Sequence, residues 1–518
     1  MKKNLLLIAC LAGLSNLPAR SQQPADDTSV ISRIRQEALD HSQVMHIAHY
    51  LTDVAGSRLT NSPGYERASR WAVKTLAGWG LRDAHLEAWG RFGQGWSIEH
   101  CSIAMAAPYY MPLIGYPFAW TRGTSGPITA QVVLVGDLQV DSIRKLGAVL
   151  KGKLVMTRKN NAELPSAFKA FAERYSDSAL AHLGDTYMIG KEELSGMMGL
   201  IDQWRRAIRL LQQLGAAGVL YSSASDRDGT VSASAWFTGT KGAWPDLPVL
   251  ALAREHYLMI QRLVADSQPV RLQLNVQTRF WDKDPNGYNV IAEIPGTDPT
   301  LKSQLVMLGG HLDSWYAGTG ATDNAAGCAV MMEVVRIFQA LHLSPRRTIR
   351  IALWSGEEQG LLGSHGYALR HFGDPVTMKL LPEQARVSAY YNLDNGSGRI
   401  RGIFTQGNQA VVPLFRQWLA PFADLGASTV TTANTGSTDH FTFDAVGIPA
   451  FQFIQDPLEY ETRTHHTNMD TYDHLQADDL KQAAAVVAAF VYHTAMQDDL
   501  LPRKPLPQPG PWLFDLFH

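Results

Sequence analysis

Histidines, aspartates and glutamates follow several apolar runs in the C-terminal half of this 518-residue chain. His311 and Asp313 follow one such run, and the pair Glu357 and Glu358 follows another. Neutral imidazoles and carboxylates, with no thiolate among them, form a ligand set that zinc accepts. The pattern therefore predicts a metal centre, and its other candidate residues are Asp323, Asp394 and His466.

The number of these side chains suits two metal ions. Two ions about 3.5–4 Å apart need one shared carboxylate and two further ligands each. We predict that Asp323 bridges the two ions. His311 and Glu358 would then complete one site. Asp394 and His466 would complete the other.

Two further carboxylates have expected roles beside the ions. Glu357 holds no metal in this assignment, so we expect it to act as the base for a bridging water. Asp313 lies two residues after His311 and would accept the second imidazole proton, which fixes the tautomer of the ring. Each motif alone has a more ordinary explanation, because Asp323 resembles a helix cap and Asp394 precedes the turn dipeptide Asn-Gly. The five ligands in order favour the metal centre.

The elements that carry these residues alternate between strands and helices from about residue 284. Apolar stripes over residues 328–341 and Leu480–Met496 predict helices, and a helical stretch is also expected over residues 27–53. Such alternation is typical of an α/β fold in which helices flank a mostly parallel sheet. Ligands gather at the carboxyl ends of the strands in such sheets. The predicted strands are Gln304–Leu308, Thr348–Trp354, Val387–Leu393 and Pro449–Ile454.

The candidate residues lie in five stretches, namely Gly309–Trp315, Gly318–Gly327, Trp354–Gly360, Asn392–Asp394 and His465–Thr471. Together these strongly resemble the co-catalytic two-zinc exopeptidase family of the secreted aminopeptidase, glutamate carboxypeptidase and carboxypeptidase Q type. The resemblance implies two Zn²⁺ per chain held by the same five ligands, with Glu357 as the base. It implies a cis peptide between Asp323 and Asn324, and a homodimer. It also selects His466 rather than His465 as the ligand.

Residues 122–278 have a different pattern, in which helical pieces separate short apolar runs. They resemble a protease-associated domain inserted into the zinc peptidase fold, on the evidence of Lys151–Met156, Leu214–Leu220 and Leu247–Leu250. The expected organisation is a signal peptide (1–21), a discontinuous zinc peptidase domain (22–121 and 279–500), the inserted β-rich domain (122–278) and a proline-rich C-terminal tail (501–518).

The N-terminus predicts export to the periplasm or the medium. Lys2 and Lys3 precede a ten-residue apolar run at Leu5–Leu14, and Ala19–Ser21 provides small residues for cleavage. Lipid attachment at Cys10 is the alternative. No later apolar run reaches the roughly 18 residues of a membrane span, and the net charge of −2 does not favour nucleic acid. The two other cysteines, Cys101 and Cys328, are expected to be buried thiols.

The predicted function is zinc-dependent hydrolysis of peptide bonds at the N-terminus of peptides or in dipeptides. A carboxypeptidase of the glutamate carboxypeptidase type is one alternative, because end selection depends on groups that the sequence does not reveal. A non-catalytic receptor-like module on the same fold is another, and the complete ligand set argues against it. A one-zinc aminoacyl cyclase of related fold is disfavoured by Asp394 and His466. His440 lies in a segment that resembles a loop lining the family's pocket. The other interpretation is that His440 is a packed structural histidine.

Overall fold

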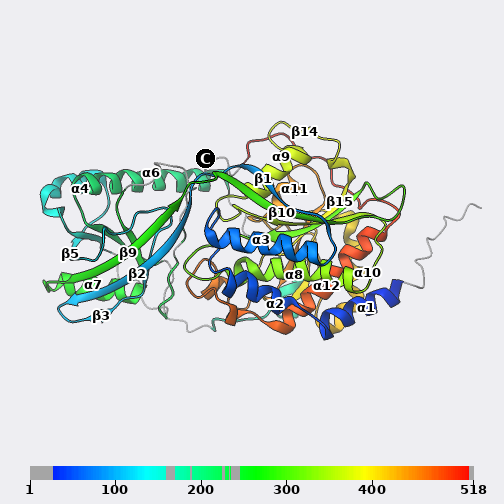
Figure 1. The fold of residues 1–518 in the computed structure, drawn as a ribbon, viewed down its shortest axis with the longest axis horizontal. Helices are drawn as coiled ribbons and strands as arrows, with labels where there is room; N and C mark the ends of the chain where they lie inside the picture. The colour runs from blue at the N-terminus through cyan, green and yellow to red at the C-terminus, as the bar shows by residue number, and fades with distance from the viewer. Residues whose placement is uncertain are drawn as a thin grey trace, which may run out of the picture.

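A computed structural model of the chain describes residues 27–158, 170–186, 190–223, 228–232, 234 and 246–512. Two eight-stranded sheets lie next to each other along the long axis of the molecule (Figure 1). The predicted signal peptide, with Cys10 inside it, lies outside the described residues. None of the helices in the described part of the chain is long and apolar enough to cross a membrane.

The first sheet carries most of the C-terminal half of the chain. Its strand order is β1-β10-β12-β11-β15-β18-β16-β17. The four central strands β12, β11, β15 and β18 run parallel to one another. Strand β10 pairs antiparallel with β1 and β12, and β16 pairs antiparallel with β18 and parallel with β17. The strands are β1 (Arg82–Arg91), β10 (Asn286–Ile294), β11 (Leu305–His311), β12 (Thr348–Trp354), β15 (Val387–Asn392), β16 (Ile400–Phe404), β17 (Thr429–Thr431) and β18 (Ala450–Gln455).

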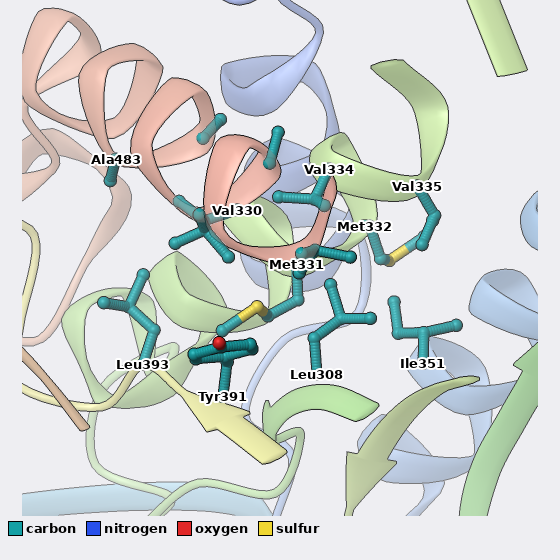
Figure 2. Close-up of a cluster of buried hydrophobic side chains, with 14 of the residues drawn as sticks. Leu308, Val330, Met331, Met332, Val334, Val335, Ile351, Tyr391, Leu393 and Ala483 are labelled. Atoms are coloured by element: carbon teal, nitrogen blue, oxygen red, sulfur yellow. The ribbon is translucent and has the colours of Figure 1, made fainter. Parts of the chain in front are cut away.

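Helices cover both faces of this sheet, so apolar side chains on both sides of its central strands are buried. Leu308 and Tyr391 lie under Met331 and Val330 on one face (Figure 2). Met307 packs on the opposite face, because successive side chains of a strand point to opposite sides. Helices α1 (Asp27–Asp40), α2 (Val44–His49), α3 (Pro63–Gly78), α8 (Ala326–Ala340), α10 (Val412–Leu419) and α12 (Ala477–Met496) contribute to the first face, and α9 (Leu362–His371) and α11 (His440–Asp444) to the second.

The single helical stretch expected over residues 27–53 is interrupted. The chain leaves α1 at Asp40 and enters α2 at Val44. Between them, the side chain of Ser42 and the backbone N–H of Gln43 each donate a 3.0 Å hydrogen bond to the buried carboxylate of Glu333. A buried charge needs such partners, so tertiary contact with α8 overrides the local helical pattern.

The second sheet begins earlier in the chain than the expected boundary at residue 122. Strand β2 pairs with β9 from Gly95–Trp281 to Ala107–Arg271, so residues 95–117 belong to this sheet. The identity of the sheet as a protease-associated domain stays a prediction. Its order is β3-β2-β9-β5-β6-β7-β8-β4, and helices α4, α6 and α7 accompany it (Figure 1).

The strands and helices of the second sheet span residues 95–281. Its strands are β2 (Gly95–Ala107), β3 (Met111–Pro112), β4 (Gly115–Pro117), β5 (Ile128–Val135), β6 (Leu154–Thr157), β7 (Gly218–Ser222), β8 (Val249–Leu252) and β9 (Arg271–Trp281). Its helices are α4 (Val140–Leu146), α6 (Lys191–Gln213) and α7 (Arg254–Ala265). Helix α5 (Asp177–Ala181) lies apart from them, in a segment whose Leu180 packs against Phe404 and Ile454 of the first sheet.

Candidate metal centre

The predicted ligands come together at one edge of the first sheet. His311 is the last residue of β11, Glu358 follows β12, and Asp394 follows β15. His466 lies in the long loop after β18. Because these four strands are parallel neighbours, their carboxyl ends meet at the same edge. Asp323 joins them from the turn that opens α8.

The Asp323 carboxylate lies between two imidazoles. Its Oδ1 is 3.1 Å from Nε2 of His311, and its Oδ2 is 3.1 Å from Nε2 of His466. The peptide between Asp323 and Asn324 is cis, as the resemblance implies. A Cβ on Gly327 would lie 2.1 Å from the carbonyl oxygen of Leu393. Only glycine therefore lets the start of α8 approach the end of β15 so closely.

The shortest contacts favour a division of the ligands between the two sites that differs from the expected one. Oδ1 of Asp394 lies 3.3 Å from Nε2 of His311, and Oε2 of Glu358 lies 3.0 Å from Nε2 of His466. His311 and Asp394 therefore form one group with Oδ1 of Asp323, and His466 and Glu358 form the other with Oδ2. Ligand atoms of His311, Asp323 and Glu358 also lie within 4.8 Å of one another. We assign the groups by the shorter contacts, because ligands of one ion must lie closest together.

The charges of this cluster fit cations. Burial and the neighbouring Asp323 raise the pKa of Glu358 to about 7. Burial by itself lowers the pKa of His466, but Glu358 and Asp323 raise it well above its usual range. Among the described residues, no donor makes a hydrogen bond to Oδ2 of Asp323 or Oε1 of Glu358, although both atoms are buried. Bound dications would compensate such crowded, unpartnered carboxylates.

No lysine or arginine in the described ranges forms an ion pair with a carboxylate of the centre, whose ion-pair partners are all histidines. The buried side chain of Arg58 lies beneath the centre but donates to carbonyl oxygens of Leu51, Leu312, Thr319 and Gly320. Burial lowers the pKa of Arg58, and Asp470, Asp313 and Asp323 act in the opposite direction. Arg58 thus ties together the backbone on both sides of the site.

Asp313 has a different contact from the one expected. Nδ1 of His311 lies 3.0 Å from the backbone carbonyl oxygen of Asp313, whereas the carboxylate is 3.7 Å away. The carboxylate instead accepts hydrogen bonds from the hydroxyl of Thr60 at 3.0 Å and from the backbone N–H groups of Glu357 and Glu358 at 3.3 and 3.4 Å. Asp313 therefore fixes the backbone of the Glu357–Glu358 pair, and its carbonyl orients the imidazole.

Sequence reasoning missed three residues that support the centre. Thr60 accepts a 3.0 Å hydrogen bond from the backbone N–H of Gly356, in addition to its bond to Asp313. Asp470 accepts bonds from the backbone N–H groups of Thr322 and Asp323, at 2.6 and 3.1 Å. Arg58 is the third. Asp470 stood in a stretch that already carried a ligand, whereas no local signal marked Thr60 or Arg58 because their partners are distant in sequence.

Glu357 lies beside the ligands without a short contact to them. Its Oε2 is 3.9 Å from Nε2 of His311, and its side chain is 10% exposed. Burial raises the pKa of Glu357 well above its usual range, and Asp394, Asp439 and Glu358 add to this, whereas His311 opposes it. Glu357 therefore lies next to the ligand cluster without belonging to it.

Two other histidines have clear places. The ring of His465 lies against that of His466, with centroids 3.8 Å apart and planes inclined by 39°. Its Nε2 lies 3.9 Å from Oδ2 of Asp323. It is more distant than His466, which agrees with the choice of His466 as the ligand. His440 is fully buried, and its Nε2 lies 2.9 Å from the carbonyl oxygen of Thr435. His440 is therefore packed inside the protein. Cys328 is also buried, and Cys101 is half-buried.

Known proteins provide an independent comparison. Residues 289–491 match the profile of peptidase family M28. Carboxypeptidase Q from Bos taurus is 25% identical over 460 residues, which cover 88% of this chain and 85% of that protein. Leupeptin-inactivating enzyme 1 from Streptomyces exfoliatus is 33% identical over 172 residues, or 33% of this chain and 36% of that protein.

Solved structures share the fold. The peptidase M28 precursor from Shewanella amazonensis superposes with a TM-score of 0.66 at 24% identity, over 93% of this chain and 99% of its own. The zinc aminopeptidase BSAP from Bacillus subtilis superposes with a TM-score of 0.55 at 18% identity, over 88% of this chain and 95% of its own. The predicted α/β fold is thereby confirmed. The profile match and the relatives above make residues 289–491 similar to peptidase family M28, and the chain is a metallo-exopeptidase.

Proposed function

We propose that this chain is a two-zinc exopeptidase that removes residues from the N-terminus of peptides or splits dipeptides. One observation carries the proposal: the two oxygens of Asp323 face two different imidazoles, each at 3.1 Å. A carboxylate shared in this way is what a pair of adjacent cations requires. His311 and Asp394 would hold one ion, and His466 and Glu358 the other.

Bound zinc supplies Lewis acidity, which polarises a carbonyl oxygen and lowers the pKa of water. Glu357 does the proton transfer in this proposal. Its carboxylate accepts the proton of the attacking water and donates it to the amine that leaves. Asp313 holds the backbone of Glu357 through the 3.3 Å bond to its N–H, so the base stays beside the ligands. No serine or cysteine nucleophile is required.

The charge around the centre supports a preference for a free amine over a free carboxylate. Within the described ranges, the carboxylates of the centre have no lysine or arginine as an ion-pair partner. The guanidinium of Arg58 is committed to backbone carbonyl oxygens. A substrate's C-terminal carboxylate would need a cationic partner to be held in a desolvated site, whereas an ammonium group is attracted by the acidic cluster.

A panel of substrates tests this proposal. A dipeptide, a longer peptide, its N-acetylated form and its C-amidated form are incubated with the zinc-loaded enzyme and after removal of metal by a chelator. We expect loss of cleavage on N-acetylation, little effect of C-amidation, and no cleavage of any substrate after chelation. Cleavage that survives N-acetylation but not C-amidation would assign the enzyme as a carboxypeptidase instead.

A further inference from the structure

Two segments of the inserted region contact the loop that carries His466. We define the His466 loop as residues 456–470, between β18 and the turn at 471. The first inserted segment, residues 170–186, is called the arm. The second, residues 228–232, is called the clasp. Both are described parts of the region between β6 and β8, so the inserted region reaches back to the edge of the first sheet.

The arm fastens the start of the His466 loop. Glu173 and Leu458 exchange two backbone hydrogen bonds of 3.0 and 2.9 Å. The fully buried carboxylate of Asp456 accepts a 2.9 Å bond from the guanidinium of Arg174 and a 3.0 Å bond from the backbone N–H of Tyr175. Arg401, which lies outside the arm, also donates a 2.9 Å bond to Asp456, so the arm supplies part of the partners that this buried charge needs. The arm is therefore part of what holds this loop in place.

The clasp fastens the end of the same loop, through Asn468. Oδ1 of Asn468 accepts a 2.6 Å bond from the N–H of Val231, and the amide group donates a 3.3 Å bond to the carbonyl oxygen of Gly229. The backbone N–H of Asn468 donates a 3.1 Å bond to the carbonyl oxygen of Val231. Ser232 and Thr467 form a bridge next to these bonds. Three hydrogen bonds thus meet at a residue two positions after His466.

The imidazole of His466 depends on these attachments more than the imidazole of His311 does. The side chain of His311 is 1% exposed at the end of a central strand, whereas that of His466 is 33% exposed. His466 also has a left-handed backbone conformation, with φ of 58°. Surrounding protein therefore fixes the position of His311, but the position of His466 is set by how its loop is held.

We propose that the inserted region completes the metal centre, with Asn468 as a positioning residue that holds His466 in place through the clasp. The inference rests on the proposed two-zinc function. Outer residues that orient a metal ligand typically change metal affinity 10–100-fold when they are removed. Loss of Asn468 should weaken only the ion that His466 and Glu358 hold. The ion at His311 and Asp394 should keep its affinity.

The test is zinc affinity in the full-length protein, measured by competition with a chromophoric chelator. We expect wild type to bind two ions, and Asn468→Ala to raise the Kd of one ion by about 10–100-fold and leave the other unchanged. Asn468→Asp keeps the acceptor for Val231 and loses the donor to Gly229. Its Kd for the affected ion should therefore lie between the values for wild type and Asn468→Ala. Asn275→Ala is the control, because the side chain of Asn275 in β9 contacts Gln277 and neither the arm nor the clasp.

Folding is checked separately by circular dichroism of the metal-free proteins. Should Asn468→Ala not fold, Arg174→Ala tests the same proposal from the arm side and is expected to weaken the same ion. Unchanged affinity for both ions in the folded variants would overturn the role of the inserted region. A wild-type protein that binds only one zinc ion would instead overturn the two-zinc proposal, so the two failures are distinguishable.

Discussion

The hydroxyl of Thr60 donates a 3.0 Å hydrogen bond to Oδ2 of Asp313 across 253 residues of sequence. Both side chains are fully buried. The same hydroxyl accepts a bond from the N–H of Gly356, and Asp313 accepts from the N–H groups of Glu357 and Glu358. A segment before α3 therefore supports the residue that we propose as the base.

Replacing Thr60 tests this support. Thr60→Val keeps the shape of the side chain but leaves the N–H of Gly356 without a partner and removes one of the donors to the Asp313 carboxylate. Such a buried unsatisfied group costs about 1–3 kcal/mol, so we expect lower stability in urea denaturation and a reduced kcat. Thr60→Ser retains the hydroxyl and is the control. Equal kcat and stability in Thr60→Val and wild type would contradict the role.

The role of Glu357 is separable from metal binding. Glu357→Gln removes the proton acceptor but leaves the five ligands in place, so zinc content should stay at the wild-type value. Turnover should fall about 10²–10⁴-fold, the usual contribution of a general base. Zinc is measured by elemental analysis and turnover with a free-amine dipeptide. Near-normal turnover in a zinc-replete variant would show that another group takes the proton.

The division of the ligands between the ions is tested by pairs of substitutions. His311→Ala with Asp394→Ala removes two ligands of one ion, so about one ion per chain should remain. His311→Ala with Glu358→Ala removes one ligand from each ion, so both should weaken. The opposite pattern would support the pairing of His311 with Glu358. Zinc content after dialysis against a weak chelator provides the measurement, and Asp323→Ala should weaken both ions.

His371, the last residue of α9, is expected to make a pH-dependent contribution to the free energy of unfolding. Its ring lies 2.7 Å from Oε1 of Glu87 and 3.3 Å from Oε2 of Glu383. Burial by itself lowers the pKa of His371, but hydrogen bonds to Glu383 and Glu87 raise it from 6.5 to about 9. For Glu383, burial acts upward, but His371 and Arg350 lower the pKa from 4.5 to about 2.

The direction of the effect follows from these shifts. A raised histidine pKa stabilises the fold fully below pH 6.5, and this contribution is lost as the pH rises through about 9. The contribution of Glu383 is present above pH 4.5 and is lost as the pH falls through about 2. We expect His371→Ala to lower the free energy of unfolding by roughly 2–3 kcal/mol at pH 5.5, and by much less at pH 9.5.

Urea denaturation at the two pH values measures this effect. His85→Ala is the matched control, because the exposed ring of His85 is 3.8 Å from the same Glu87 and exposed pairs contribute little. An equal loss in His371→Ala at pH 5.5 and 9.5 would show that packing, rather than charge, accounts for the contribution of His371.

Much of the secondary structure of this protein could be predicted from the local pattern of apolar residues in the sequence. Strand ends could be predicted because strands such as β12 consist mostly of apolar residues, and the candidate ligands and base follow where the strand stops. His311, Glu358 and Asp394 were found in this way, since parallel neighbours place their carboxyl ends at one edge. Helices with a clear apolar stripe, such as α12, were found for the same reason.

Only the tertiary structure shows which of the candidate ligands lie closest to one another. β11 has both β12 and β15 as neighbours, so sheet order alone allows His311 to pair with Glu358 or with Asp394. The loop after β18 brings His466 to Glu358, although β18 lies beside β15. The contacts of Asp313 and the start of the second sheet were likewise set by partners distant in sequence. Periodicity reports the burial of a segment, but it carries no information about which distant segment packs against it.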